Sequence, residues 1–330
     1  MNGRARKLLG IHHVTAITGD PQENVDFYVG TLGLRLVKRT VNQDDPGTYH
    51  LFYADAVGNP GTDLTFFAWP QALHGREGVG QASAVALAIP QSSLSYWTAR
   101  LREHGISFEG PSRRFDEDVL SFSDVHGQAL ELVAAPDAEA RQWQPWTDGP
   151  VPPEQAIRGI HGITLMESAD DPTATFLKEP LGFWRAAQED RRTRFGVGAG
   201  GSGAWLDLVV TSGGQRGRVA VGNIHHVAWR TPNDAEQQAW WQQMQDHGVA
   251  ISEIIDRFWF HSIYFREPGG VLFEIATDGP GFLTDEPLSE LGIRLVLPPW
   301  LEPSRAQIER ALPPIELPRP VRGQKQKSPV

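Results

Sequence analysis

An internal repeat constrains the fold of this chain more than any other feature of the sequence. The tripeptide Gly-Ile-His occurs at residues 10–12 and again at 159–161, an offset of 149 (159 minus 10). The tetrapeptide Ile-His-His-Val occurs at 11–14 and again, letter for letter, at 224–227. Recurrences at fixed offsets indicate structural units that have been duplicated within one chain.

The repeats divide the chain into four related units. Units 1 and 3 share the first offset, whereas units 2 and 4 share an offset of 143 (274 minus 131) that aligns Glu131 with Glu274. In order, the units span residues 8–70, 80–136, 157–212 and 221–278. A segment rich in Pro, Asp, Gln and Gly joins the two halves. We therefore expect an N-terminal pair of modules at 8–136, a C-terminal pair at 157–280, an extension at 281–316 and a disordered tail at 317–330.

Unit 4 shows the internal order of a unit most clearly. An apolar segment at 224–230 predicts a strand, Asn233 can cap the helix that follows, and Gly248 can end that helix. The remaining segments with the composition of strands lie at 251–255, 261–265 and 271–276. This order predicts a βαβββ module, and four such modules predict an α+β fold.

Composition and charge restrict the chemistry. The 330 residues include no cysteine and eleven histidines, so a transition metal would have to be held by imidazole and carboxylate groups. The formal net charge of −10 disfavours a nucleic-acid partner. No run of residues reaches the length of a membrane span, and we expect a cytoplasmic protein that does not bind membranes.

Two repeated His-His pairs are the strongest candidates for metal ligation. The pair at 12–13 begins a strand of unit 1, the pair at 225–226 occupies the same place in unit 4, and Glu274 lies on the last strand of unit 4. If the strands of a unit curl into one sheet, these residues can meet on its concave face. Two imidazoles and one carboxylate on one face of a metal form the site of non-haem Fe(II) oxygenases. Adjacent strand residues point to opposite faces, so one histidine of each pair is expected to bind, and alternation cannot choose which.

The other units have lost the histidines of this site. Gly162 and Ala84 stand where the second histidines of the pairs would be, so Glu131 has no histidine partners and is interpreted as a structural relic. In unit 1, Thr65 stands where unit 4 has its glutamate, counted from the preceding turn glycine. The sequence therefore favours one open site with three ligands over a site with a second carboxylate.

These features resemble the vicinal-oxygen-chelate superfamily. Three segments look like its hydroquinone-specific ring-cleaving branch. They are the Ile-His-His-Val-Thr start, the run Asp-Arg-Phe…Tyr-Phe-Arg-Glu-Pro at 256–268 and the tail Leu-Pro-Pro-Trp-Leu-Glu-Pro at 297–303. The resemblance extends from about residue 9 to 315. It implies two curved mixed β-sheets shaped as half-barrels, with units 1 and 4 paired around the metal and units 2 and 3 paired together.

The resemblance also implies the site residues. It makes the second histidine of each pair a ligand, so the metal set is His13, His226 and Glu274. It implies catalytic roles next to the metal for His12, Thr15, His225, Arg257 and Tyr264. The implied cofactor is Fe(II), with Mn(II) as the alternative.

The implied function is Fe(II)-dependent ring cleavage of hydroquinone-type diols with O2. Three alternatives stay open: a catechol extradiol dioxygenase, which would use the same ligands; a glyoxalase-like isomerase or lyase, which Thr65 argues against; and a quinone- or drug-binding protein without catalysis. The expected partners are a small aromatic diol and O2, and the sequence leaves open whether the chain forms a homo-oligomer.

Overall fold

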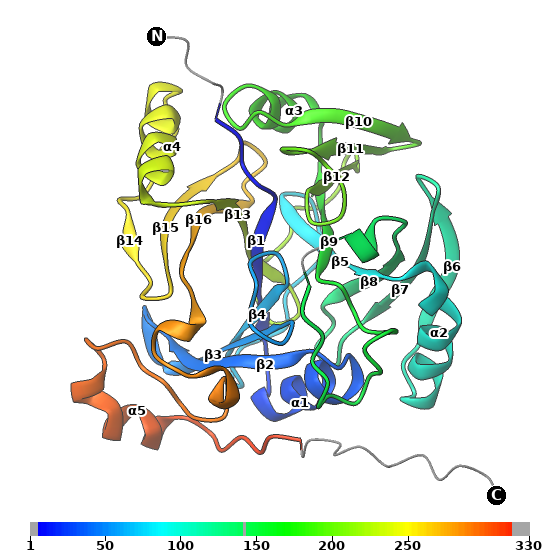
Figure 1. Ribbon diagram of the computed structural model, residues 1–330. Helices are drawn as coiled ribbons and strands as arrows, with labels where there is room; N and C mark the ends of the chain where they lie inside the picture. The colour runs from blue at the N-terminus through cyan, green and yellow to red at the C-terminus, as the bar shows by residue number, and fades with distance from the viewer. Residues whose placement is uncertain (1–5, 141–142, 319–330) are drawn as a thin grey trace, which may run out of the picture.

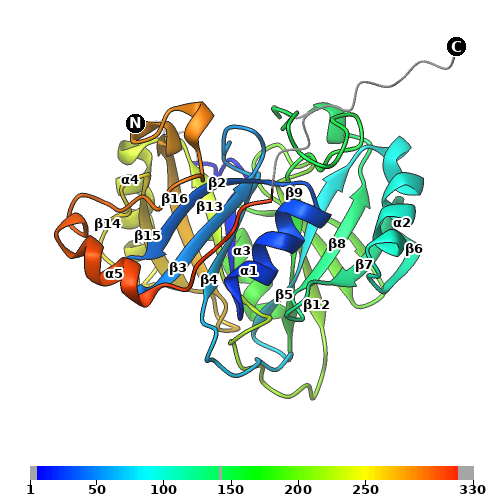
Figure 2. The ribbon, with the colours of Figure 1, turned by 90° about the horizontal axis from the view of Figure 1, so that it is seen from below.

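The four repeated units build two eight-stranded sheets that lie side by side (Figures 1 and 2). The computed structural model describes residues 6–140 and 143–318. Sheet 1 has the strand order β14-β15-β16-β13-β1-β4-β3-β2, and sheet 2 has the order β10-β11-β12-β9-β5-β8-β7-β6. Both sheets mix parallel and antiparallel pairs, which confirms the α+β fold with two curved mixed sheets.

Sheet 1 combines the first and fourth units. Its strands are β1 (Ile11–Thr18), β2 (Arg35–Asn42), β3 (Asp45–Ala54), β4 (Asp63–Ala68), β13 (Ile224–Thr231), β14 (Ile255–Asp256), β15 (Phe260–Arg266) and β16 (Leu272–Pro280). The two units meet where β1 pairs antiparallel with β13 at the centre of the sheet. The implied pairing of unit 1 with unit 4 is confirmed.

Sheet 2 combines the second and third units in the same way. Its strands are β5 (Gln81–Ile89), β6 (Phe108–Arg114), β7 (Glu117–Ser123), β8 (Ala129–Ala134), β9 (Ile160–Glu167), β10 (Trp184–Glu189), β11 (Arg192–Gly196) and β12 (Trp205–Val210). Each half of the sequence, 8–136 and 157–280, thus contributes one module to each sheet. The expected boundaries of these halves as domains stay a prediction.

Helices cover the outer faces of the sheets (Figure 1). They are α1 (Pro21–Val25), which continues as a π-helical turn at Asp26–Thr31, α2 (Leu94–Glu103), α3 (Asp171–Lys178) and α4 (Asp234–Asp246). The start of α4 follows the prediction, because the Asn233 side chain accepts a hydrogen bond from the backbone N–H of Glu236. Gly248 follows the helix with a φ of 71°, which suits glycine at a helix end.

The strand expected at 251–255 is wrong in extent. Only Ile255 and Asp256 form β14, and Ile251 makes a single bridge to Phe265. Ser252 departs from regular pairing: its backbone N–H donates to the carbonyl oxygen of Tyr264, but the N–H of Tyr264 donates to the Ser252 hydroxyl instead of a backbone carbonyl.

The extension after the fourth module runs along the edge of sheet 1. It contains short 3₁₀ turns at Phe282–Thr284, Leu288–Glu290 and Glu302–Ser304, followed by α5 (Arg305–Ala311). The fully buried Lys38 of β2 anchors this extension through ion pairs with Asp285 and Glu286. Most of the tail expected to be disordered, 319–330, lies outside the described residues. No helix within the described ranges is long and apolar enough to cross a membrane.

Candidate metal centre

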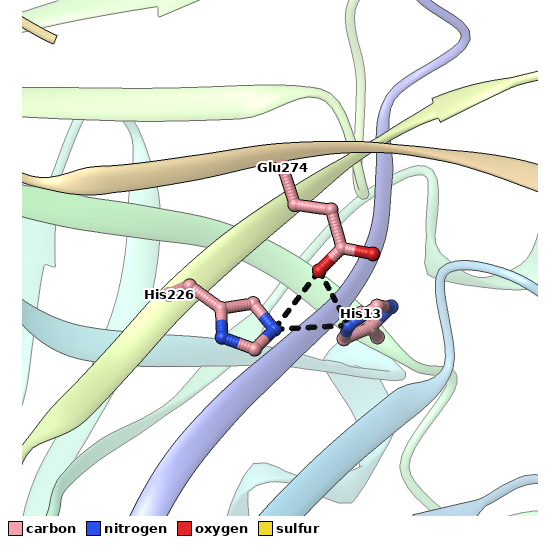
Figure 3. A group of neighbouring side chains, drawn as sticks. All are labelled: His13, His226 and Glu274. Atoms are coloured by element: carbon pink, nitrogen blue, oxygen red, sulfur yellow. Dashed lines mark hydrogen bonds and ion pairs between the residues drawn. The ribbon is translucent and has the colours of Figure 1, made fainter. Parts of the chain in front are cut away.

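Three buried side chains converge on the concave face of sheet 1 (Figure 3). His13 comes from β1, His226 from β13 and Glu274 from β16. The Nε2 atom of His226 lies 3.0 Å from Glu274 Oε2 and 3.3 Å from His13 Nε2, and His13 Nε2 lies 3.4 Å from Glu274 Oε2. Within the described ranges, this triad is the one group of three or more His, Cys, Asp or Glu side chains whose ligand atoms converge in this way.

The spacing of the three atoms fits a metal ion. If two ligand atoms each lie about 2.1 Å from a metal ion, they are about 3.0 Å apart when the ligand–metal–ligand angle is a right angle. They are about 3.4 Å apart when that angle is tetrahedral. All three observed distances fall in this interval. Among the residues that the structure describes, Glu274 Oε2 finds no hydrogen-bond partner while both histidines are neutral. Three converging lone pairs in a buried site need a cation, because burying unpaired polar atoms is costly.

A pair of β-bulges places both histidines of each tandem pair near the site. In the pairing of β1 with β13, the register shifts between Ile11 and His13, so that His12 is an extra residue on β1. A second shift leaves His225 as the extra residue on β13. A bulge breaks the alternation of side chains between the two faces of a strand. For this reason both histidines of a pair lie near the site, although only the second of each pair, His13 and His226, belongs to the triad.

The buried His12 fixes the orientation and tautomer of His13. His12 Nε2 lies 3.1 Å from the carbonyl oxygen of Thr277, which can only accept, so this nitrogen carries the hydrogen. Burial lowers the pKa of His12 to about 3, which keeps the ring neutral and leaves Nδ1 as an acceptor. His13 Nδ1, at 2.9 Å, then donates to it. The remaining nitrogen of a neutral His13, Nε2, presents its lone pair to the metal position.

His225 stands in the same relation to His226. The two Nδ1 atoms lie 2.8 Å apart, and burial lowers the pKa of His225 to about 3. When His226 binds through Nε2, its Nδ1–H donates to His225, and the hydrogen of His225 is then on its own Nε2. His225 differs from His12 in position, because its ring lines the cavity next to the triad.

The carboxylate of the triad is held in its ionised form. Burial by itself would raise the pKa of Glu274, but in the metal-free site a proton on His13 or His226 outweighs burial and holds the pKa well below its usual range. The Ser262 hydroxyl donates a hydrogen bond to Oε1 of the same carboxylate. Oε2 is therefore the atom left for the metal.

A cavity of about 290 Å³ opens beside the triad. This volume is at the lower limit for small-molecule sites, which suits a single substituted ring better than a larger ligand. Aromatic side chains make up part of its wall: Phe52, Phe67, Trp259 and Phe260. The polar groups around it are Asn42, Gln43, Asp44, His50, His225, Arg257 and Tyr264.

The structure separates the five residues for which catalytic roles were expected. His225, Arg257 and Tyr264 line the cavity, whereas His12 lies behind His13. Thr15 also lies behind the cavity wall, fully buried, with its hydroxyl 2.8 Å from that of Thr65. The catalytic roles of all five stay predictions.

His50 is a cavity residue that the sequence did not reveal. Its Nε2 lies 2.9 Å from the hydroxyl of Thr65, the residue that replaces a second carboxylate. His50 of β3 pairs with the residue of β4 that lies two positions after Thr65. In the same way, Ser262 of β15 pairs with the residue of β16 that lies two positions after Glu274. His50 and Ser262 are therefore equivalent in the two modules. No motif marks His50, and only strand pairing relates it to the site.

In sheet 2, arginine side chains occupy the corresponding region. Arg114, the repeat counterpart of Arg257, makes two hydrogen bonds of 2.7 and 2.8 Å to Glu131. Arg194 binds Asp207 and Glu117 in the same cluster. The interpretation of Glu131 as a structural residue agrees with this ion pair.

Comparisons with known proteins agree with this architecture. A model of the family described as the Glyoxalase/Bleomycin resistance protein/Dioxygenase superfamily matches residues 10–132 and 159–275. The "Putative ring-cleaving dioxygenase MhqO" of Bacillus subtilis (strain 168) is 44% identical over 313 residues, which cover 95% of this chain and 98% of that protein.

Two further similarities extend the comparison. The "Chlorohydroquinone/hydroquinone 1,2-dioxygenase" of Sphingobium indicum is 33% identical over 311 residues, which cover 92% of this chain and 95% of that protein. A crystal structure of a "putative dioxygenase" from Bacillus subtilis subsp. subtilis str. 168 superposes with a TM-score of 0.88 at 42% identity, covering 96% of this chain and 100% of that one.

Proposed function

The chain belongs to the glyoxalase/bleomycin resistance protein/dioxygenase superfamily, and we propose that it is a ring-cleaving dioxygenase that uses Fe(II) and O2 to open hydroquinone-type diols. The observation that carries the proposal is the triad of His13, His226 and Glu274 beside a small cavity with aromatic walls. The names of the relatives, one of them a hydroquinone 1,2-dioxygenase, support ring cleavage and a para-diol substrate.

The two imidazoles and the carboxylate of the triad suit an iron ion that is bound by the protein on one of its faces. Two neutral imidazoles and one carboxylate are the ligands of non-haem Fe(II) oxygenases, and Mn(II) accepts the same donors. Fe(II) held there would supply what side chains lack, namely Lewis-acid activation of a ring hydroxyl and electron transfer to O2. The protein's part is to bind and orient the diol, exclude water and place protons.

Aromatic side chains orient the ring. Phe67 packs 6.4 Å from His226 between ring centroids, and Phe260 lies 5.2 Å from His13. Both side chains line the cavity, so a substrate ring beside the triad contacts apolar faces and displaces water. Only the hydroxyl groups of the diol then need polar partners.

Three polar side chains can hold or move protons in the cavity. His225 carries its hydrogen on Nε2 when His226 is a ligand, and can donate it to a bound oxygen atom. Burial raises the pKa of Tyr264, so its hydroxyl stays protonated and serves as a donor. The Arg257 Nε lies 3.4 Å from the Tyr264 hydroxyl, and this guanidinium can stabilise negative charge that develops on a bound oxygen atom in the cavity.

The structure also bears on the alternatives. A glyoxalase-like isomerase with a fourth ligand would need a carboxylate at position 65, where the Thr65 hydroxyl instead bonds Thr15 and His50. A binding protein without catalysis would not need the metal triad. Catechol cleavage uses the same ligands, and a direct comparison of substrates must separate it from hydroquinone cleavage.

Oxygen uptake tests the proposal. Fe(II)-loaded protein, prepared anaerobically, should consume one O2 per ring opened with methylhydroquinone and much less with catechol. Mass spectrometry should find a ring-opened acid that contains both oxygen atoms of labelled O2. Absence of uptake across a panel of substituted hydroquinones would refute the proposal, and faster uptake with catechol would reassign the substrate class.

A further inference from the structure

We propose that Asp44 makes the site selective for uncharged aromatic diols, because it occupies the guanidinium that a ring carboxylate would otherwise bind. The inference rests on the proposed function, since it takes the substrate to be an aromatic diol. It goes further by stating which diols the cavity admits.

The guanidinium of Arg257 already has an acidic partner at the mouth of the cavity. Its Nη1 and Nη2 atoms lie 3.2 and 3.0 Å from the two carboxylate oxygens of Asp44, a two-pronged contact. Its Nε lies 3.4 Å from the Tyr264 hydroxyl. The Arg257 side chain is 17% exposed and that of Asp44 is 72% exposed, so the pair spans from the cavity to solvent.

The pair also joins the two modules of sheet 1. Asp44 lies in the turn between β2 and β3 of the first module, and Arg257 lies between β14 and β15 of the fourth. The adjacent Gln43 side chain donates a hydrogen bond to the carbonyl oxygen of Arg257, at 2.9 Å. Backbone and side chain of Arg257 are thus both held by the same turn.

Arg257 is the only Lys or Arg among the residues of the described chain that line this cavity. A substrate carboxylate would therefore find no free cation other than the metal. Wherever it binds, at the metal included, it would have to displace Asp44 from Arg257 or lie in the same small cavity as that second negative charge, and either outcome costs binding energy. A neutral diol meets neither cost. Rejection of one ligand class by an unfavourable contact is a common source of specificity.

The counterpart of Arg257 in sheet 2 has a different carboxylate partner, so the arginine side chain at this position can adopt either of two directions. Arg114 has turned inward to Glu131, the counterpart of Glu274. Arg257 turns instead to Asp44. An Arg257 released from Asp44 would accordingly be available to a carboxylate inside the cavity.

The test compares two diols of similar size that differ in charge, methylhydroquinone and 2,5-dihydroxybenzoate. Binding of each to the Fe(II)-loaded protein is measured by calorimetry under argon, where no turnover occurs, for wild type, Asp44→Asn and Asp246→Asn. Asp246 is an exposed carboxylate on α4, so its variant has the same net charge as the Asp44 variant. The readout is the ratio of the two dissociation constants.

We expect wild type to favour methylhydroquinone, and Asp44→Asn to move the ratio toward the carboxylated diol by about fivefold, the upper end for an exposed ion pair. Asp246→Asn should leave the ratio unchanged. An unchanged ratio in Asp44→Asn, an equal shift in Asp246→Asn or no binding of either diol would overturn the inference. A shifted ratio in a protein that takes up no O2 would uphold the selectivity and refute the dioxygenase, so the two failures are distinguishable.

Discussion

Replacing Glu274 by Gln should abolish tight metal binding while leaving the fold intact. Glu274 is fully buried, and its Oε2 is the only charged ligand atom of the triad. The amide of Gln has nearly the same shape and can keep the contact with Ser262, but it brings no negative charge. The substitution therefore tests the ligand role with little change in packing.

The expected magnitude follows from binding linkage. Loss of a residue that merely orients a ligand weakens metal binding about 10- to 100-fold, so loss of the charged ligand Glu274 should weaken it at least about 100-fold. Metal at 100 times the wild-type dissociation constant stabilises the folded state by about 2.7 kcal/mol. The same concentration would stabilise Glu274→Gln by only about 0.4 kcal/mol. A chain of 330 residues unfolds with an entropy of about 0.7 kcal/mol/K, so the metal-induced rise in Tm should fall from about 4 °C to about 0.6 °C.

The assay is a thermal melt with and without Fe(II) or Mn(II) under argon, together with metal analysis after dialysis. The matched control is Glu131→Gln, which alters the equivalent carboxylate of sheet 2 and removes the negative charge that pairs with Arg114. This control should lower Tm but keep the full metal-induced shift. A full shift in Glu274→Gln, or its loss in Glu131→Gln, would refute the assignment of the ligand set.

Two further predictions concern buried groups outside the cavity. His12→Ala should weaken metal binding about 10- to 100-fold, measured by competition with a chelator, because His13 loses the partner that orients it; unchanged affinity would show that this contact does not matter. Burial and the neighbouring Glu267, partly offset by Arg216, raise the pKa of Glu167 from 4.5 to about 8. The folded state then holds a proton that the unfolded chain releases, so stability should fall as pH rises from about 4.5 to 8, by at most about 1.4 kcal/mol per pH unit. Urea unfolding of Glu167→Gln should show this slope reduced, and an identical slope in wild type and variant would contradict the reasoning.

Much of the fold could be predicted from the sequence, because the duplicated modules repeat the same residues at fixed spacings. The two Ile-His-His-Val segments and the aligned glutamates locate the modules, and the Asn233 cap together with Gly248 locates α4. Each of these signals is read from a short segment of sequence, although the repeated segments themselves lie far apart in the chain. The strand expected at 251–255 is wrong in extent because a side chain, Ser252, replaces a backbone contact.

The sequence by itself determined the four modules and the pool of metal-binding residues, and it excluded a thiolate site because cysteine is absent. Only the tertiary structure brought His13 and His226, 213 positions apart, to 3.3 Å. It also decided that both histidines of each pair approach the site, because the two bulges arise from the register between β1 and β13. The pairing of β3 with β4 places His50 in the cavity, and the turn between β2 and β3 places Asp44 there. The face to which a strand residue points depends on pairing with a distant strand, and no local pattern of residues encodes that pairing.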